Sequence, residues 1–330
     1  MRMLVLALAL FVAGCKTSTM KSIGIIDRMD PTLDSIIDKD AKMEIIAEGH
    51  EWTEGPVWVE SGKMLLYSDI PPNKIFKWTE ANGAELYLTP SGYTGTTART
   101  GEPGSNGLVL DKDGRLVLCQ HGDRRIAVMT TPLNRPEPNF VTLADNYNGK
   151  KLNSPNDLVY NSDGDLLFTD PPYGLEKNMD DPLKEIPFQG VYRLTPTGEV
   201  ELLVDSITRP NGIVFTPDEK HVIVANSDPN DAVWYIFDLG VNDTLTNKRV
   251  LFDATPASKN EKGLPDGLKI DKNGNIFATG PGGVWIFNKD GKQIGKLRIP
   301  EACSNVALAD NDKTLYITAD MYVLRVKLRE

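Results

Sequence analysis

A residue with side-chain oxygens recurs six times along the chain, each time at the start of an apolar run. These anchor residues are Glu54, Asn106, Asn156, Asn211, Asp266 and Asn305, in EGPVWV, SNGLVL, PNDLVY, PNGIVF, PDGLKI and SNVALA. Carboxylates and carboxamides gathered at one point offer only oxygen ligands, which hard divalent cations prefer. The alternative is that each residue caps a turn. Because all six positions carry only Asn, Asp or Glu, we favour a cation site.

The expected ion follows from the donor set. An irregular cage of six to eight oxygens suits Ca²⁺ better than Mg²⁺, and two carboxylates, Glu54 and Asp266, would neutralise its charge. The chain has only 3 histidines and no HExxH motif, so a metalloprotease-type zinc helix is excluded. We therefore expect one divalent metal ion, Ca²⁺ ahead of Zn²⁺ or Mn²⁺.

The elements that must position these anchors form a repeat. Consecutive anchors are separated by 39 to 55 residues, and each is followed by a strand, a turn rich in Asp, Asn and Gly, and a second strand. Two more β-branched or aromatic runs complete most units. Six units of four short strands predict an all-β six-bladed β-propeller with four-stranded blades. A pair of β-sandwiches would not explain one polar anchor in each unit.

Propeller geometry predicts where the anchors lie. The starts of all six innermost strands share one face, and the second strands end on that face at Asp69, His121, Asp170 and Asn226. The long connections 90–105 and 170–190 open there and would cover its mouth. The last unit has only three strands after Asn305, so we expect residues 43–48 to supply the fourth and close the ring.

The N-terminus resembles a bacterial lipoprotein signal. An apolar run over residues 4–13 is too short to span a bilayer and ends in Val-Ala-Gly-Cys15. The alternative is a plain secretory signal. We predict a signal peptide over 1–14, a tether over 15–41 and the propeller over 42–330. The expected location is the periplasmic or cell-surface side of a membrane, which the protein contacts only through its lipid.

Composition excludes one class of partner. The net charge of −10 argues against nucleic-acid binding, which needs a basic surface. Export permits a disulfide between Cys119 and Cys303, but both lie in apolar stretches, which favours two buried free thiols.

Five motifs carry a family resemblance. EGPVW, NSPNDL, TDPPYGL, RPNGI and LPDGL are similar to segments of bacterial gluconolactonases in the regucalcin (senescence marker protein)/gluconolactonase superfamily, over residues 43–328. Diisopropylfluorophosphatase-like enzymes are related to this superfamily. The resemblance implies a six-bladed propeller with one divalent metal, often calcium, at its axis. It implies four metal ligands, Glu54, Asn156, Asn211 and Asp266, and substrate-binding roles for Asn106, His121 and Asn156.

The implied reaction is metal-dependent hydrolysis of a sugar lactone, in a monomer whose partner is this small substrate. The resemblance places a general base or nucleophile at Asp266, and no GxSxG pentapeptide competes. His121 is either a substrate-facing acid or base or a buried, hydrogen-bonded structural residue. Two other functions remain open: an esterase or phosphotriesterase on the same metal site, and a propeller that binds a ligand without catalysis.

Overall fold

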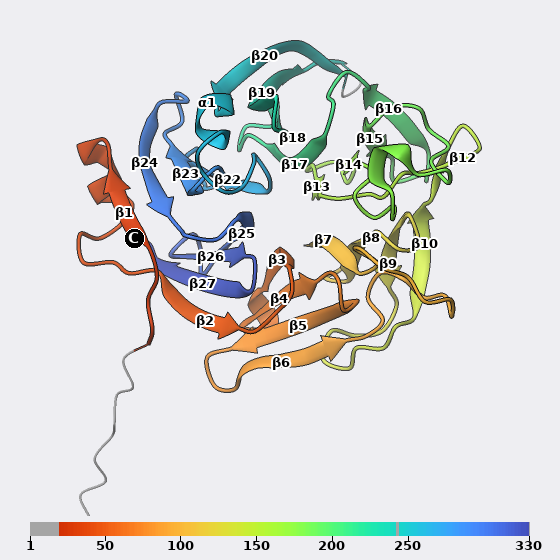
Figure 1. The fold of residues 1–330 in the computed structure, drawn as a ribbon, viewed down its shortest axis with the longest axis horizontal. Coiled ribbons are helices and arrows are strands. Elements are labelled where there is room, and N and C mark those ends of the chain that lie inside the picture. Colours follow the sequence, from red (N-terminus) through yellow and green to blue (C-terminus); the bar gives the residue numbers. More distant parts are fainter. Residues whose placement is uncertain (1–19, 242–243, 330) are drawn as a thin grey trace, which may run out of the picture.

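The computed structural model describes residues 20–241 and 244–329, in which six antiparallel sheets surround a central axis (Figure 1). The predicted six-bladed propeller is confirmed. Blade 1 contains β3 (Thr53–Val59), β4 (Met64–Asp69), β5 (Lys74–Thr79) and β6 (Gly83–Leu88). Blade 2 contains β7 (Ser105–Leu110), β8 (Leu116–Gln120), β9 (Arg125–Met129) and β10 (Phe140–Ala144). Blade 3 contains β13 (Leu158–Tyr160), β14 (Leu166–Asp170), β15 (Gly190–Leu194) and β16 (Val200–Val204).

Blade 4 contains β17 (Pro210–Phe215), β18 (His221–Asp228), β19 (Asp231–Leu239) and β20 (Leu245–Asp253). Blade 5 contains β21 (Leu268–Ile270), β22 (Ile276–Gly280), β23 (Gly283–Phe287) and β24 (Gln293–Arg298). Blade 6 contains β25 (Cys303–Ala309), β26 (Thr314–Ala319) and β27 (Tyr322–Lys327). The remaining elements are short: β1 (Ile25–Arg28), η1 (Pro31–Ser35), β2 (Glu44–Glu48), η2 (Glu60–Gly62), β11 (Asn146–Tyr147), β12 (Lys150–Lys151), η3 (Asn178–Asp180) and α1 (Thr255–Ser258).

The hydrophobic pattern explains this layering. The second strand of a blade is covered on both faces by neighbouring blades, and β14, β22 and β26 are buried along their whole length. Such strands are continuously apolar rather than alternating. The outermost strands are more exposed, as in β20. The core is therefore divided into clusters packed within and between the blades.

The ring closes as predicted. β2 pairs antiparallel with β27, giving the order β2-β27-β26-β25 in the last blade. Figure 1 shows this N-terminal strand on the outside of the C-terminal one. Residues from the two ends of the chain thus share one sheet, which removes an exposed strand edge.

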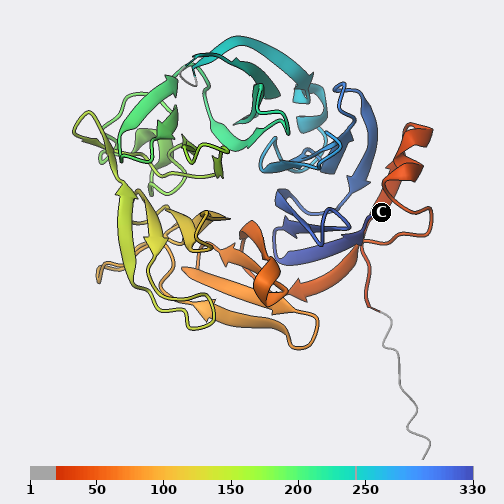
Figure 2. The ribbon, with the colours of Figure 1, turned by 180° about the vertical axis from the view of Figure 1, so that it is seen from behind.

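The predicted tether over 15–41 is wrong for its described part. β1 pairs with β24 as a fifth strand of blade 5, and it lies on the rim of the ring in both face views (Figures 1 and 2). Leu33 and Ile37 have no exposed surface and join the core between blades 5 and 6. The cause is burial of these few apolar side chains against blades formed from distant residues. The predicted signal peptide over 1–14 and Cys15 lie outside the described residues.

Truncating a side chain in this segment tests its role. We expect Leu33→Ala to lower the free energy of unfolding by about 2–5 kcal/mol, the range for a buried leucine in a core. Ile25→Ala is the matched control, because the Ile25 side chain is 61% exposed and should change stability little. Urea denaturation measures both. Equal, negligible effects would mean that the segment is a tether after all.

Both Cys119 and Cys303 are buried free cysteines, as predicted. Burial raises the pKa of each thiol, so neither is ionised for nucleophilic attack near neutral pH. In the described ranges, no helix has the length and apolar character needed to cross a membrane.

Candidate functional site

Five of the six anchors line one cavity of about 470 Å³. They come from the first strands, or the residues just before them, of five successive blades: Glu54, Asn106, Asn156, Asn211 and Asp266. The predicted meeting of residues separated by more than 200 positions is therefore confirmed for five anchors.

Irregularities at the start of the inner strands turn the anchors away from the regular ladder. In β3 the register shifts between Glu54 and Val57, and β7 and β17 show the same shift at Ser105–Leu108 and Pro210–Ile213. Such bulges re-aim side chains beside functional sites. Asn156 and Asp266 instead precede their strands, and their backbone N–H groups donate to the second strands.

The glycine after an anchor permits close approach of the next blade. A Cβ on Gly107 would lie 2.6 Å from the Asn156 carbonyl oxygen, and one on Gly212 would lie 2.3 Å from that of Asp266. Real side chains do not tolerate such distances, so the recurring Asn-Gly or Asp-Gly pair has a packing cause. Neighbouring anchors are held together through their backbones.

Side chains at the ends of second strands hold the backbone ahead of the anchors. Each accepts hydrogen bonds from N–H groups two or three residues before an anchor: Asp69 from Glu51 and Trp52, Asp170 from Asn153 and Ser154, and Asn226 from Arg209. Burial raises the pKa of Asp170 to about 7, against the lowering effect of these two hydrogen bonds. These residues position the anchors and do not line the cavity.

Four anchor oxygens have no partner. The Oδ1 atoms of Asn106, Asn156, Asn211 and Asp266 are buried without a hydrogen bond. Each such group costs roughly 1–3 kcal/mol, and buried polar groups are nearly always satisfied in folded proteins. Four such oxygens in one cavity are the arrangement expected of ligands to a cation.

The sixth anchor has a different role from the one predicted. Asn305 Nδ2 donates to Glu54 Oε2 at 3.2 Å, while its Oδ1 accepts from the Val306 N–H. Asn305 does not line the cavity, because its side chain is engaged in holding Glu54. The anchors therefore comprise five lining residues and one supporting residue.

The two anchor carboxylates are electrostatically costly. Burial first, and then the nearby Asp157 carboxylate, raise the pKa of Glu54 to about 8. Burial and the charge of Glu54 also raise the pKa of Asp266 well above its usual range. Two close carboxylates in a low-dielectric site require a proton or a cation between them.

The donor set fits the predicted ion. The described ranges contain no cluster of three or more His, Cys, Asp or Glu suited to a metal. The implied ligands Glu54, Asn156, Asn211 and Asp266 instead combine two carboxylates with two carboxamides around orphaned oxygens. Calcium accepts such all-oxygen ligands in irregular arrangements.

His121 fits neither alternative fully: it is buried, as the second alternative predicts, but it lacks the predicted hydrogen bonds. It is completely buried and absent from the cavity lining, yet neither ring nitrogen has a hydrogen-bond partner. Its Nδ1 lies 3.4 Å from Oε2 of Glu102, which does line the cavity. His121 therefore reaches the site only through this carboxylate.

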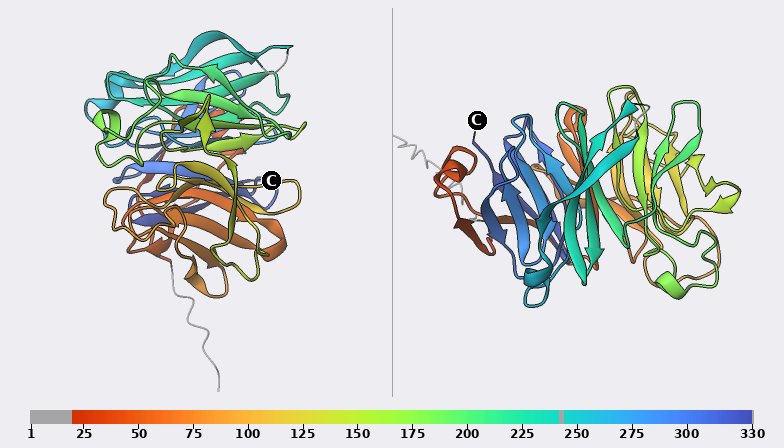
Figure 3. Two further views of the ribbon diagram at one scale, coloured as in Figure 1. Left: turned by 90° about the vertical axis from the view of Figure 1, so that its right-hand side faces the viewer. Right: turned by 90° about the horizontal axis from the view of Figure 1, so that it is seen from above.

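Residues outside the predicted set of site residues complete the walls. Glu102 and Tyr173 each come from one of the loops predicted to cover the mouth, 90–105 and 170–190. The loops contact each other, since Arg99 donates to the Gly174 carbonyl oxygen at 2.9 Å. In Figure 3, η3 of the second loop and α1 project from the same face of the ring.

Arg209 is the only cation among the described residues that line this cavity. Both Tyr173 and Arg209 stand in motifs quoted above, TDPPYGL and RPNGI, whereas nothing in the sequence marks Glu102. The wall thus carries one positive charge beside the anchors, suited to holding substrate oxygens.

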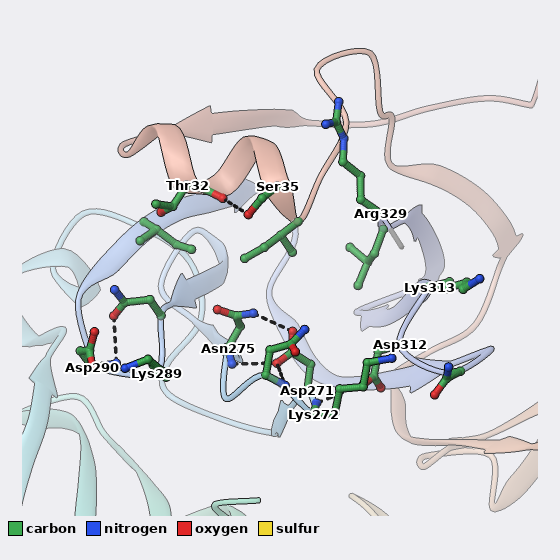
Figure 4. Close-up of a pocket in the computed structure, with 16 residues that line it drawn as sticks. Thr32, Ser35, Asp271, Lys272, Asn275, Lys289, Asp290, Asp312, Lys313 and Arg329 are labelled. Atoms are coloured by element: carbon green, nitrogen blue, oxygen red, sulfur yellow. Dashed lines mark hydrogen bonds and ion pairs between the residues drawn. The ribbon is translucent and has the colours of Figure 1, made fainter.

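A second groove, of about 350 Å³, lies between blades 5 and 6 and the N-terminal segment (Figure 4). Its polar residues mostly belong to turns, and Asp271 accepts hydrogen bonds from Asn273 and Asn275 of its own turn. None of its side-chain atoms is a buried, unpartnered acceptor. Nothing there indicates chemistry.

Comparison with known proteins agrees with this fold. The chain is 38% identical to a gluconolactonase of Zymomonas mobilis over 93% of this chain and 87% of that protein. A gluconolactonase structure from Xanthomonas campestris superposes with a TM-score of 0.79 at 27% identity, covering 95% of this chain and 99% of the other. A calcium-binding regucalcin from Agrobacterium tumefaciens shares the fold, with a TM-score of 0.65 at 16% identity, over 86% and 94% of the two chains.

The family profile described as the SMP-30/gluconolactonase/LRE-like region matches residues 52–320, which include all six anchors. The match begins beside the first anchor and ends within the last blade, after β26. The chain therefore belongs to the SMP-30/gluconolactonase/LRE-like family.

Proposed function

We propose that this protein hydrolyses a sugar lactone of the gluconolactone type in the cavity formed by the anchors. The observation that carries the proposal is the group of four orphaned Oδ1 atoms, beside Glu54, in one cavity large enough for a small sugar. The 38% identity to the Zymomonas gluconolactonase supports a lactone as substrate. The cavity's position at the starts of the inner strands supports the axial face as the place of reaction.

A divalent cation, Ca²⁺ ahead of Zn²⁺ or Mn²⁺, would be held by Glu54, Asn156, Asn211 and Asp266. When bound, such an ion polarises the lactone carbonyl and offsets the negative charge that develops on its oxygen. The orphaned oxygens and the two mutually repelling carboxylates support this assignment.

The chain's own residues bind and orient the substrate. Asn106 and Asn156 present carboxamides to the cavity, and the Arg209 guanidinium can donate to lactone oxygens. Trp52 and Tyr173 provide apolar walls that limit access of bulk water. Asp266 is the partly exposed carboxylate among the anchors and accepts the proton of the attacking water.

A substrate panel tests the proposal. Metal-stripped protein is reloaded with Ca²⁺, Zn²⁺ or Mn²⁺ and assayed on gluconolactone, p-nitrophenyl acetate and a phosphotriester. We expect the highest kcat/KM for the lactone. Preference for the phosphotriester would support the related esterase or phosphotriesterase function. Binding of lactone without turnover of any substrate would support a non-catalytic propeller.

Loosening the loops over the cavity should alter substrate binding. Arg99→Ala removes the hydrogen bonds to Gly122 and Gly174, so we expect KM for gluconolactone to rise on the order of tenfold, as for loss of a charged hydrogen bond. Ca²⁺ affinity, measured by calorimetry, should stay unchanged. Arg135→Ala is the control, because that side chain is 84% exposed. An unchanged KM in Arg99→Ala would show that the loop contact does not shape the site.

We also propose that the protein is an exported lipoprotein acylated at Cys15. The support is the apolar run followed by Val-Ala-Gly-Cys15 at the N-terminus. Labelled palmitate should be incorporated into the wild-type protein in bacterial cells and not into Cys15→Ala. Equal labelling of the two would remove the basis for a lipid anchor.

A further inference from the structure

We propose that Glu102 transfers a proton to the leaving ring oxygen of the lactone, and that His121 is the positioning residue that holds Glu102 and supplies its proton. This inference rests on the proposed lactone hydrolysis. Neither role follows from the motifs of the sequence; both come from the arrangement of one buried imidazole, one carboxylate and the cavity.

Burying the His121 imidazole without hydrogen bonds is energetically unfavourable. Its exposed fraction is 0%, and both ring nitrogens lack a hydrogen-bond partner. Buried polar groups without partners are rare in folded proteins and each costs roughly 1–3 kcal/mol. The one ionisable group within ion-pair distance is Glu102, at 3.4 Å from Nδ1. The imidazole is thus placed to exchange a proton with this carboxylate.

Glu102 connects the imidazole to the cavity. Its side chain is 36% exposed and lines the cavity, whereas the His121 side chain is not exposed at all. The backbone holds the pair in place, since the His121 N–H donates to the Gly104 carbonyl oxygen at 3.2 Å. A proton that leaves Glu102 toward the cavity can be replaced from His121 on its protected side.

Glu102 and Asp266 are two separate carboxylates of the cavity, so they can serve different atoms of the substrate. Glu102 precedes β7 of blade 2, and Asp266 precedes β21 of blade 5, on opposite sides of the ring (Figure 1). The two carboxylates therefore reach the cavity from opposite directions. In the tetrahedral intermediate the attacking oxygen and the ring oxygen are separate substituents of one carbon, so a carboxylate apart from Asp266 is available to the ring oxygen while Asp266 serves the water.

Other cavity residues are poorly suited to this transfer. Glu54 is buried and held by Asn305, and it is one of the implied cation ligands. Burial raises the pKa of the Cys303 thiol. Glu261 also lines the cavity, but its carboxylate forms ion pairs with Lys296 and Arg298, which favour its charged form. Tyr173 is the remaining competitor, because a phenol can also donate a proton, although burial raises its pKa as well.

The proton transfers balance as follows. A water oxygen forms a bond to the carbonyl carbon and gives one proton to Asp266. The bond between that carbon and the ring oxygen breaks, and the ring oxygen takes a proton from Glu102. His121 then passes a proton to Glu102, and both groups regain their starting protonation through Glu102, which is open to the cavity, while Asp266 releases its proton there. The net reaction joins one lactone and one water to give one hydroxy acid.

Dependence on the leaving group tests the assignment. Glu102→Gln keeps the shape but cannot donate as an acid, so kcat on gluconolactone should fall on the order of 10²-fold with KM within about threefold. Hydrolysis of p-nitrophenyl acetate should change by less than about threefold, because p-nitrophenolate leaves without protonation. His121→Asn should show the same selective loss on the lactone. Glu176→Gln is the matched control, an exposed carboxylate that accepts from Thr100 N in the same pair of loops.

Three results would overturn the inference. An equal loss on both substrates would place Glu102 on the side of the attacking water, and a change in KM alone would make it a binding residue. A selective loss on the lactone in Tyr173→Phe, with Glu102→Gln fully active, would move the role to Tyr173. If His121→Asn fails to fold, the leaving-group dependence of Glu102→Gln still decides. Wild-type protein that hydrolyses the ester and not the lactone would reject the proposed function instead.

Discussion

Asp266→Asn should lower kcat for gluconolactone on the order of 10²-fold or more, the contribution expected of a general base. The substitution keeps an oxygen donor of the same size at the site but removes the proton acceptor. It also relieves repulsion with Glu54, whose charge raises the pKa of Asp266. We therefore expect the melting temperature of the cation-free variant to be equal to or above that of the wild type. Steady-state kinetics and calorimetry measure the two effects.

Glu54→Gln is the matched comparison for Asp266→Asn. Glu54 is buried and held by Asn305, so it can act on the cation but not on the attacking water. Its replacement should weaken Ca²⁺ binding first, and excess Ca²⁺ should restore much of the rate. If excess Ca²⁺ restored Asp266→Asn and not Glu54→Gln, the base would have to be assigned to Glu54.

Removal of the cation should also lower stability. An ion held only by the folded ring stabilises the native state by mass action, about 2.7 kcal/mol when its free concentration is a hundred times its Kd. For a chain of this size that corresponds to a fall in melting temperature on the order of 5 °C after chelation. Glu54→Gln, measured beside the wild type, should show a smaller shift.

The fall in melting temperature after chelation has a definite cause in the anchors. Without a cation, Glu54 and Asp266 repel each other and four anchor oxygens lose their partner. An identical melting temperature before and after chelation, with elemental analysis confirming that the ion was removed, would mean that the anchors hold no stabilising cation.

Much of the fold is predictable because it repeats. One polar anchor, one turn and one apolar second strand recur six times, so the blades and the closing strand over 43–48 follow from local pattern. The fifth strand of blade 5 does not repeat. β1 pairs with β24 across some 270 residues of sequence, and only the buried Leu33 and Ile37 reveal in retrospect that this segment is packed.

The part of the site that comes from the repeat is predictable from the sequence, and the rest is not. Five anchors meet because the repeat places them at equivalent positions, but nothing in the pattern distinguishes Asn305, which turns to hold Glu54. Glu102 lies in an irregular loop whose course depends on tertiary contacts such as Arg99 with Gly174. Side chains on such loops cannot be placed from strand periodicity, and loops of this kind often carry specificity.

Diffraction from Asp266→Asn crystals soaked with Ca²⁺ and gluconolactone tests the central claim most directly. This slow variant should retain both the ion and intact lactone. We predict one anomalous peak about 2.3–2.6 Å from Oδ1 of Asn156 and Oδ1 of Asn211, the usual Ca²⁺–oxygen distance. The lactone should lie between that ion and Glu102. An ion or a lactone bound only elsewhere, such as in the groove of Figure 4, would contradict it.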